Sequence, residues 1–174
     1  MSTNRTKSNK ILIVLLCLLT AIAIGVTIFT LIRHPKQPNN SDYAPQQVEP
    51  QAEEILDEKN QEKLEQSNGG GAVSLTYSTQ VTLHLEGKNA DLLFQNPIRS
   101  NQNMMLELVL DGKTIAKTGT LEPGYKIEHL SDVDMQKLSE GSYEGEFRVS
   151  YYHTDSGEKA IVNTVIPVQI TVQK

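Results

Sequence analysis

Short runs in which apolar and polar residues alternate follow one another from residue 72 to the C-terminus. A period of two is typical of strands that present one face to a core and the other to solvent. Turn-forming residues separate the runs, for example Asp111 and Gly112. The runs cover residues 73–85, 92–94, 105–110, 113–121, 125–130, 143–152 and 160–172. The pattern therefore predicts about seven strands.

The sixth and seventh runs are the most regular, and their alternation assigns side chains to faces. The inward side chains predicted for the sixth run are Tyr143, Phe147, Val149 and Tyr151. Tyr152 is predicted to point outward. In the last run, the even-numbered residues from Ala160 to Val172 are predicted to share the inner face. Pro167 lies on the opposite face and has no N–H to donate, which indicates a sheet edge or a bulge.

About seven strands in a segment of this length favour an antiparallel β-sandwich. Leu138, Gly141 and Tyr143 form an L-x-x-G-x-Y pattern that leads into the sixth strand. In immunoglobulin-like sandwiches, a tyrosine at this place turns its hydroxyl back onto the backbone and stabilises the corner. The fold class that we expect is therefore all-β, an immunoglobulin-like antiparallel β-sandwich over residues 72–174.

Several segments of this module resemble bacterial immunoglobulin-like or fibronectin-type-III-like modules of cell-surface proteins, including those called cell-adhesion-related. The segments are FQNP (94–97), LVLDGKTIA (108–116), LEPG (121–124) and LSEGSYEGEFRV (138–149). The resemblance supports the fold and implies no ligand-contacting residue. The module has neither a tryptophan nor a cysteine pair, so it departs from antibody-type domains. The chain as a whole resembles membrane-anchored proteins of Gram-positive bacteria, which implies a localisation but no activity.

Residues 11–32 form an apolar run without a charged side chain. At about 1.5 Å per residue, a helix of this length crosses a hydrocarbon core of roughly 30 Å. The run therefore predicts a single transmembrane helix that makes the membrane a partner. The basic residues of segment 1–10 favour a cytoplasmic N-terminal tail. The localisation predicted on this basis is the cell membrane, single-pass, with the N-terminus cytoplasmic and the C-terminal domain extracytoplasmic.

A cleaved secretory signal is the alternative for this run, because Ala21 and Ala23 provide small residues for cleavage. Cleavage after Ala23 would leave an apolar new terminus beginning at Ile24, and for this reason we favour an uncleaved anchor.

Residues 33–71 are rich in Pro, Gln and Glu and end in the glycines of 69–71. This composition predicts a flexible acidic stalk. Within it, residues 51–66 contain good helix formers but few strongly apolar residues, so they predict either a short surface helix or a fraying stalk.

The formal net charge of −5 argues against a nucleic-acid partner. His84, His129 and His153 have no metal-ligand spacing, so we interpret them as surface residues. The acidic loops at Asp132 and Asp155 are typical of turns, with calcium binding as the alternative. The module has neither a G-x-S-x-G motif nor a cysteine, since Cys17 is the only one in the chain. We therefore predict no catalytic, cofactor-binding or metal residue, no cofactor and no enzymatic activity.

These observations predict a non-catalytic binding or scaffold module of the bacterial cell envelope, tethered to the membrane, with a protein or glycan partner outside it. An outward Tyr152 and exposed strand edges are the candidate contact features. The alternative is a single-pass accessory subunit of an envelope machine, such as a secretion, conjugation or division complex. In that case, small residues such as Gly25 and Ala21 would contact partners within the membrane.

Overall fold

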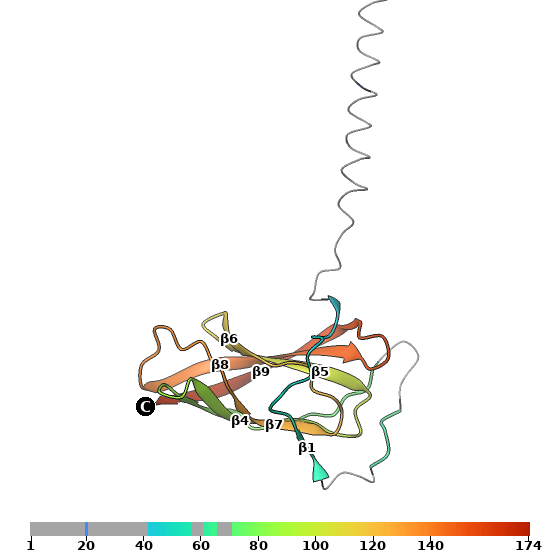
Figure 1. Cartoon of the computed structure of the whole chain (residues 1–174), viewed down its shortest axis with the longest axis horizontal. Helices are drawn as coiled ribbons and strands as arrows, with labels where there is room; N and C mark the ends of the chain where they lie inside the picture. Colours follow the sequence, from blue (N-terminus) through green and yellow to red (C-terminus); the bar gives the residue numbers. More distant parts are fainter. Residues whose placement is uncertain (1–19, 21–41, 57–60, 66–70) are drawn as a thin grey trace, which may run out of the picture. The chain divides into compact units, whose positions relative to one another are not determined.

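The computed structural model describes Thr20 and residues 42–56, 61–65 and 71–174 (Figure 1). The chain forms two units, Met1–Asn39 and Asn40–Lys174, and the strands belong to the second. They are β1 (Glu53–Glu54), β2 (Thr76–Tyr77), β3 (Gln80–His84), β4 (Asn89–Asn96), β5 (Gln102–Leu110), β6 (Lys113–Lys117), β7 (Tyr125–Leu130), β8 (Gly141–His153) and β9 (Lys159–Gln173).

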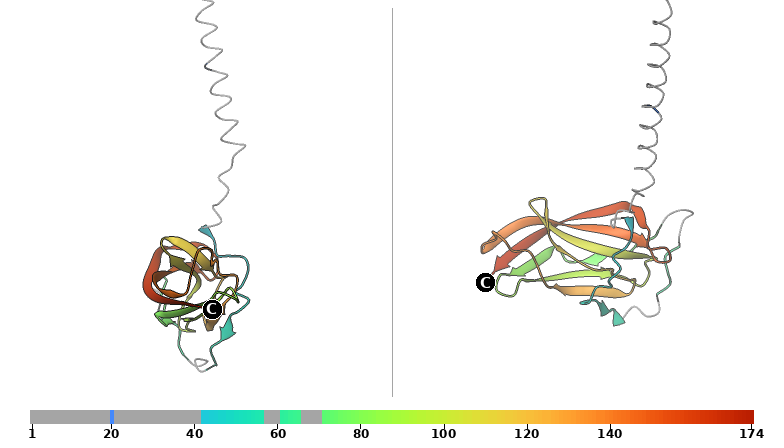
Figure 2. Two further views of the ribbon diagram at one scale, coloured as in Figure 1. Left: turned by 90° about the vertical axis from the view of Figure 1, so that its left-hand side faces the viewer. Right: turned by 45° about the horizontal axis from the view of Figure 1, so that its top comes forward.

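The strands form a two-layered sandwich (Figure 2). One layer has the order β1-β7-β4-β3, with β2 also paired to β4, and the other has the order β9-β8-β5-β6. The strand β3 joins the layers because it pairs antiparallel with β4 and parallel with β9. Immunoglobulin-like sandwiches arrange their strands in this way, with A, B and E in one layer and C, F and G in the other. The predicted all-β sandwich is confirmed.

The core lies between the layers and consists of the apolar residues that alternate along the strands. In β4 every second residue, from Ala90 to Phe94, is buried, and in β9 the same holds from Ile166 to Val172. Phe94 of one layer meets Phe147 of the other edge to face, with ring centroids 6.2 Å apart. This aromatic pair contributes on the order of 1 kcal/mol beyond its apolar burial.

The corner predicted at Tyr143 is present. The Tyr143 hydroxyl donates a hydrogen bond of 2.9 Å to the carbonyl oxygen of Ser139, four residues upstream. It also lies 3.2 Å from the Ser139 Oγ. These contacts stabilise the turn into β8, as in other immunoglobulin-like sandwiches.

The outward placement of Tyr152 is wrong. Tyr151 and Tyr152 are both buried, with 3% and 2% of their surface exposed, and the Tyr152 hydroxyl lies 3.9 Å from the sulfur of Met105. Burial raises the pKa of the Tyr152 phenol. Met104 and Met105 of the adjoining strand β5 are also both buried, so this end of the layer is covered on its two faces. A period of two separates the faces of a strand but does not show whether a second segment covers the outer one.

The inward placement of Val162 is also wrong, because Val162 is 67% exposed. Ser150 pairs with Asn163 and Tyr152 pairs with Lys159, so β9 advances by four residues where β8 advances by two. The extra residues form a bulge, and a bulge ends the regular alternation of side chains.

Residues 42–56, which we call the strap, lie in the stretch predicted to be a flexible stalk, but they pack against the sandwich. The strap forms a parallel bridge between Val48 and Thr120, and it continues into β1, which pairs with β7. The Thr120 N–H donates to the carbonyl of Gln47, and the Glu49 N–H donates to the carbonyl of Thr120. The stalk prediction is therefore wrong for these residues. They are held mainly by hydrogen bonds, made by their main chain and by the side chains of Glu49 and Gln51, and Ala52 packs against the core.

Residues 61–65 also contact the sandwich. Leu64 donates its N–H to the carbonyl of Arg99, and the Lys63 ammonium donates to the carbonyl of Ser100. The rest of the predicted stalk, residues 33–41, 57–60 and 66–70, lies outside the described residues.

The predicted single-pass localisation at the cell membrane is wrong for the part of the chain that the structure describes. No helix in that part is long and apolar enough to cross a membrane. The prediction depended on residues 11–32, which apart from Thr20 lie outside the described residues. In the described part, the long apolar stretches are strands whose side chains form the core of the sandwich.

We expect Tyr143→Phe to lower the free energy of unfolding by about 0.5 to 1.5 kcal/mol, because it removes the hydrogen bond to Ser139 at a partly exposed site. Tyr77→Phe, at a tyrosine that is 41% exposed, is the control and should change it by less than about 0.5 kcal/mol. Denaturant midpoints at unchanged slope measure both effects. Equal losses would contradict the role of the corner.

We expect Gly119→Ala to displace the strap. A Cβ at this position would lie 2.6 Å from the carbonyl oxygen of Gln47 and 2.9 Å from the nitrogen of Glu49, both in the strap backbone. Backbone atoms cannot yield as a flexible side chain can, so the strap must move. Limited proteolysis should then cut within residues 42–56 faster than in the wild type. The exposed Lys117→Ala is the matched control, and equal cleavage of the two variants would show that the strap is not held at Gly119.

Candidate functional site

One stretch of β9 lacks a strand neighbour on one side within the described residues. β9 pairs with β8 over nearly its whole length, but β3 pairs only with Gln169–Gln173. We call residues 160–167, which precede the contact with β3, the β9 edge.

The edge is open because the chain before β3 follows a different strand. The Gln169 N–H still donates to the carbonyl of Thr79, at 2.8 Å. One residue earlier, the Ser78 N–H donates to the carbonyl of Leu93, and β2 pairs with β4. The single long run predicted at residues 73–85 is therefore divided into two strands: β2 pairs with β4, whereas β3 pairs with both β4 and β9. The first of these strands leaves the β9 edge without a neighbour among the described residues.

Exposed apolar side chains gather on the β9 edge. Ile161 is fully exposed, Val162 is 67% exposed and Val165 is 57% exposed. No residue of the edge is charged, since its sequence is AIVNTVIP. Natural edge strands usually carry charged side chains, above all lysine, that prevent pairing with other chains. Contiguous exposed apolar residues are typical of interaction surfaces.

The main-chain groups of the edge also point outward at defined positions. In an antiparallel pair, residues alternate between bonding their partner strand and pointing away from it. Gln169 bonds toward β3, so Val165 and Asn163, which share its parity, direct their N–H and C=O groups away from β8. Pro167 shares this parity but has no N–H, and the bulge begins beyond Asn163. Asn163 and Val165 therefore direct regularly placed donors and acceptors outward, and no strand of the described residues pairs with them.

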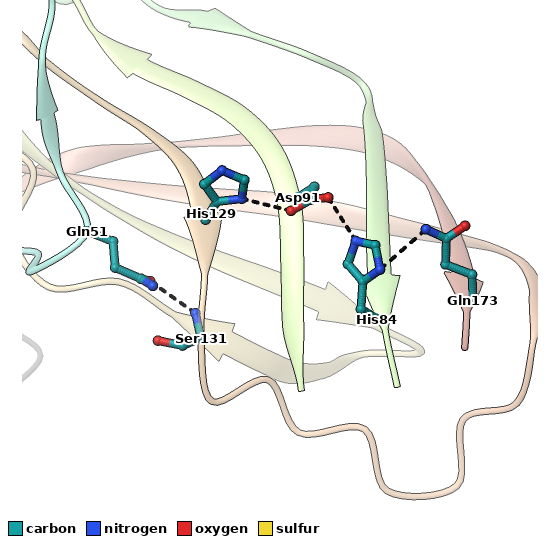
Figure 3. A network of polar contacts seen from close by, with 6 residues as sticks. All are labelled: Gln51, His84, Asp91, His129, Ser131 and Gln173. Carbon is teal, nitrogen blue, oxygen red and sulfur yellow. Dashed lines mark hydrogen bonds and ion pairs between the residues drawn. The ribbon is translucent and has the colours of Figure 1, made fainter. Parts of the chain in front are cut away.

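The outer face of the other layer carries a network centred on Asp91 (Figure 3). The Asp91 Oδ2 lies 2.8 Å from the Nε2 of His84, and its Oδ1 lies 2.8 Å from the Nδ1 of His129. The amide nitrogen of Gln173 lies 3.3 Å from the Nδ1 of His84. The hydrogen bond from His84, followed by that from His129, holds the pKa of Asp91 below its usual value of 3.8.

This network combines residues that the sequence pattern treated separately. The register of β4 places Asp91 opposite His129 of β7, and β3 brings His84 beside it. The carboxylate occupies one nitrogen of each ring. Among the described residues, no group of three histidine, cysteine or acidic side chains is arranged to hold a metal ion. The third candidate, His153, donates its main-chain N–H to Glu158 in the turn after β8.

A cleft of about 270 Å³ lies between the strap and the ends of β6 and β7. Its lining includes Gly119 and Ser131. Their N–H groups are already bonded, to the carboxylate of Glu49 and to the side-chain oxygen of Gln51 respectively. The strap thus uses the donors that a ligand would need.

Several acidic residues near the predicted turns and on β8 make local contacts. Asp134 lies 2.6 Å from the Lys113 ammonium, which holds the pKa of its carboxyl below the usual value. Glu146 accepts a hydrogen bond of 2.6 Å from the Nε of Arg148. Glu158 is part of the turn at residues 153–158 and donates its N–H to Ser156. None of these contacts brings a nucleophile and a base together.

No family model and no curated protein matches this chain. Among solved structures, the chain is similar to the periplasmic chaperone SfaE, with 13% identity, 59% of this chain and 56% of that chain covered, and a TM-score of 0.35. It is also similar to AggA, the major subunit of aggregative adherence fimbriae type I from Escherichia coli, with 10% identity, 65% and 100% covered, and a TM-score of 0.31. The match spans little more than half the length of the chaperone. These likenesses are too distant to assign a role to any residue.

We expect Asp91→Asn to lower the free energy of unfolding by a small amount that depends on pH. The pKa of Asp91 is lower in the folded than in the unfolded chain, so its contribution to stability is present above the unfolded pKa and is lost as pH falls through the folded pKa. Because the side chain is 49% exposed, screening limits this contribution to about 0.5 kcal/mol.

Denaturant unfolding of both proteins at pH 6 and at pH 2.5 measures this difference, with the exposed Glu86→Gln as control. The free energy of unfolding of Asp91→Asn should be lower than that of the wild type at pH 6, and the two should be equal at pH 2.5. A deficit that persists unchanged in acid would show that the carboxylate charge is not its source.

Proposed function

We propose that this chain is a non-catalytic binding module of the bacterial cell envelope, and that it binds a protein partner through the β9 edge. The observation that carries the proposal is the uncharged open edge with exposed Ile161, Val162 and Val165. The envelope location is supported by the resemblance of segments 94–97, 108–116, 121–124 and 138–149 to bacterial cell-surface modules.

The chemistry of the edge favours a protein over a glycan. A protein strand added to an open edge gains main-chain hydrogen bonds, and pockets or patches at alternate side chains select its sequence. Asn163 and Val165 offer such main-chain groups. The side chain of Val165 adds an apolar contact. The edge presents no aromatic or charged side chain that would bind sugar hydroxyls or stack on a sugar ring.

The remaining polar groups support a binding function rather than catalysis. The Asp91 carboxylate bonds two histidines, Asp134 pairs with a lysine, and Glu146 pairs with an arginine. Each of these contacts is satisfied within the module.

A photoactivatable residue at position 161 tests the proposal. In the full-length chain, incubated with envelope extract of the source bacterium, it should form discrete adducts with protein, including other copies of this chain. The same residue at position 77, an exposed apolar site on the other layer, is the matched control and should give none of them. Equal labelling at both positions, no labelling at 161, or adducts sensitive only to glycan-degrading enzymes would overturn the proposal.

A further inference from the structure

We infer that the occupant of the β9 edge is a second copy of this chain, paired antiparallel with the first about a two-fold axis at Thr164. The inference rests on the proposed function and names the partner at the same site. A two-fold interface uses the same surface on both copies, so the surface must be complementary to itself.

The length of the open edge is consistent with this axis. β3 covers β9 from Gln169 onward, and its first contact is the bond from Gln169 to Thr79. The stretch of β9 free to pair therefore ends at Pro167. Residues 161–167 are symmetric about Thr164, so each residue of the stretch finds an opposite residue in the second copy.

The directions of the main-chain groups agree with the same axis. Asn163 and Val165 point their N–H and C=O groups outward, and the axis at Thr164 places Asn163 of one copy opposite Val165 of the other. Each such pair exchanges two hydrogen bonds, and symmetry doubles the number to about four. An axis at Asn163 would place Val165 opposite a bulge residue and use fewer of the available donors. An axis at Val165 would use the same donors, with the Pro167 carbonyl as an acceptor, but it would pair only residues 163–167.

The side chains of the paired stretch introduce no repulsion between charges. The axis at Thr164 places Ile161 opposite Pro167 and Val165 opposite Asn163. The nearest charged side chain of the strand, Lys159, lies beyond the paired stretch. Like charges would not be apposed along the edge, and apposed like charges are the usual barrier to edge pairing.

The interface is small and each copy carries a net charge of −5. An interface of one strand edge belongs to the weak class, with a dissociation constant on the order of micromolar or higher. Salt screens the repulsion between two acidic copies, so higher ionic strength should strengthen the dimer.

Sedimentation of the full-length Cys17→Ser protein over a range of concentrations tests the dimer, in non-ionic detergent because residues 11–32 are apolar. We expect a monomer–dimer equilibrium that Val165→Lys weakens at least tenfold. Tyr77→Lys, which introduces the same charge at an exposed apolar site on the other layer, should leave it unchanged. A dimer that both variants weaken equally, or that neither weakens, would overturn the inference.

Disulfide formation tests the axis. In a non-hydrogen-bonded antiparallel pair, opposite Cα atoms lie about 4.5 Å apart, within reach of a disulfide. With an added oxidant, Thr164→Cys should therefore cross-link two copies faster than Val165→Cys in the same Cys17→Ser background. Faster cross-linking of Val165→Cys would place the axis elsewhere and overturn this register.

The outcomes distinguish the two proposals. A protein that stays monomeric at all concentrations, but whose position 161 labels a different protein, overturns the second copy as partner and leaves the proposed function standing. A monomer whose position 161 labels no protein overturns both.

Discussion

The double pairing of β3 is the constraint on which the rest of the structure depends. Five residues of β3 pair in parallel with the end of β9, and three of the same strand pair antiparallel with β4. The two layers are thereby joined at one side, and Phe94 and Phe147 meet between them. The same constraint produces the candidate site. β3 is too short to cover the fifteen residues of β9, and the chain before it pairs with β4 instead.

The two edges of the sandwich differ in whether their main-chain groups have partners among the described residues. On the β7 side, the strap supplies main-chain partners: Glu53 and Glu54 pair with β7, and Gln47 and Glu49 bond Thr120. Glu49 is almost completely buried there, and its carboxylate accepts the N–H of Gly119. On the β9 side, Pro167 and the bulge limit pairing but do not prevent it, because Asn163 and Val165 lie between them. The strap thus covers one edge, whereas the β9 edge is open and apolar. This difference supports the β9 edge as the contact surface.

The Asp91 network and the β9 edge lie on different layers and have different physical characters. The network consists of exposed polar groups that satisfy one another, so its contribution to stability is screened by solvent. The edge consists of main-chain groups without a strand partner among the described residues, beside exposed apolar side chains. Burial of the edge against another strand makes the free energy of association more favourable. Burial of the network would make it less favourable, because charged groups would lose their hydration.

The sequence by itself determined the strand content and the corner at Tyr143, because alternation with a period of two and the L-x-x-G-x-Y pattern are local signals. It also determined that Pro167 gives no N–H to the sheet, since a missing N–H is a property of that residue alone. The bulge of β9 lies elsewhere, at residues 159–163. Only the tertiary structure decided the burial of Tyr152, the exposure of Val162 and the docking of the strap. Each of these depends on register, on a bulge or on main-chain hydrogen bonds between segments far apart in the chain, for which side-chain pattern carries no signal. The open β9 edge belongs to this second group, because it depends on where β3 ends its pairing rather than on any residue of β9.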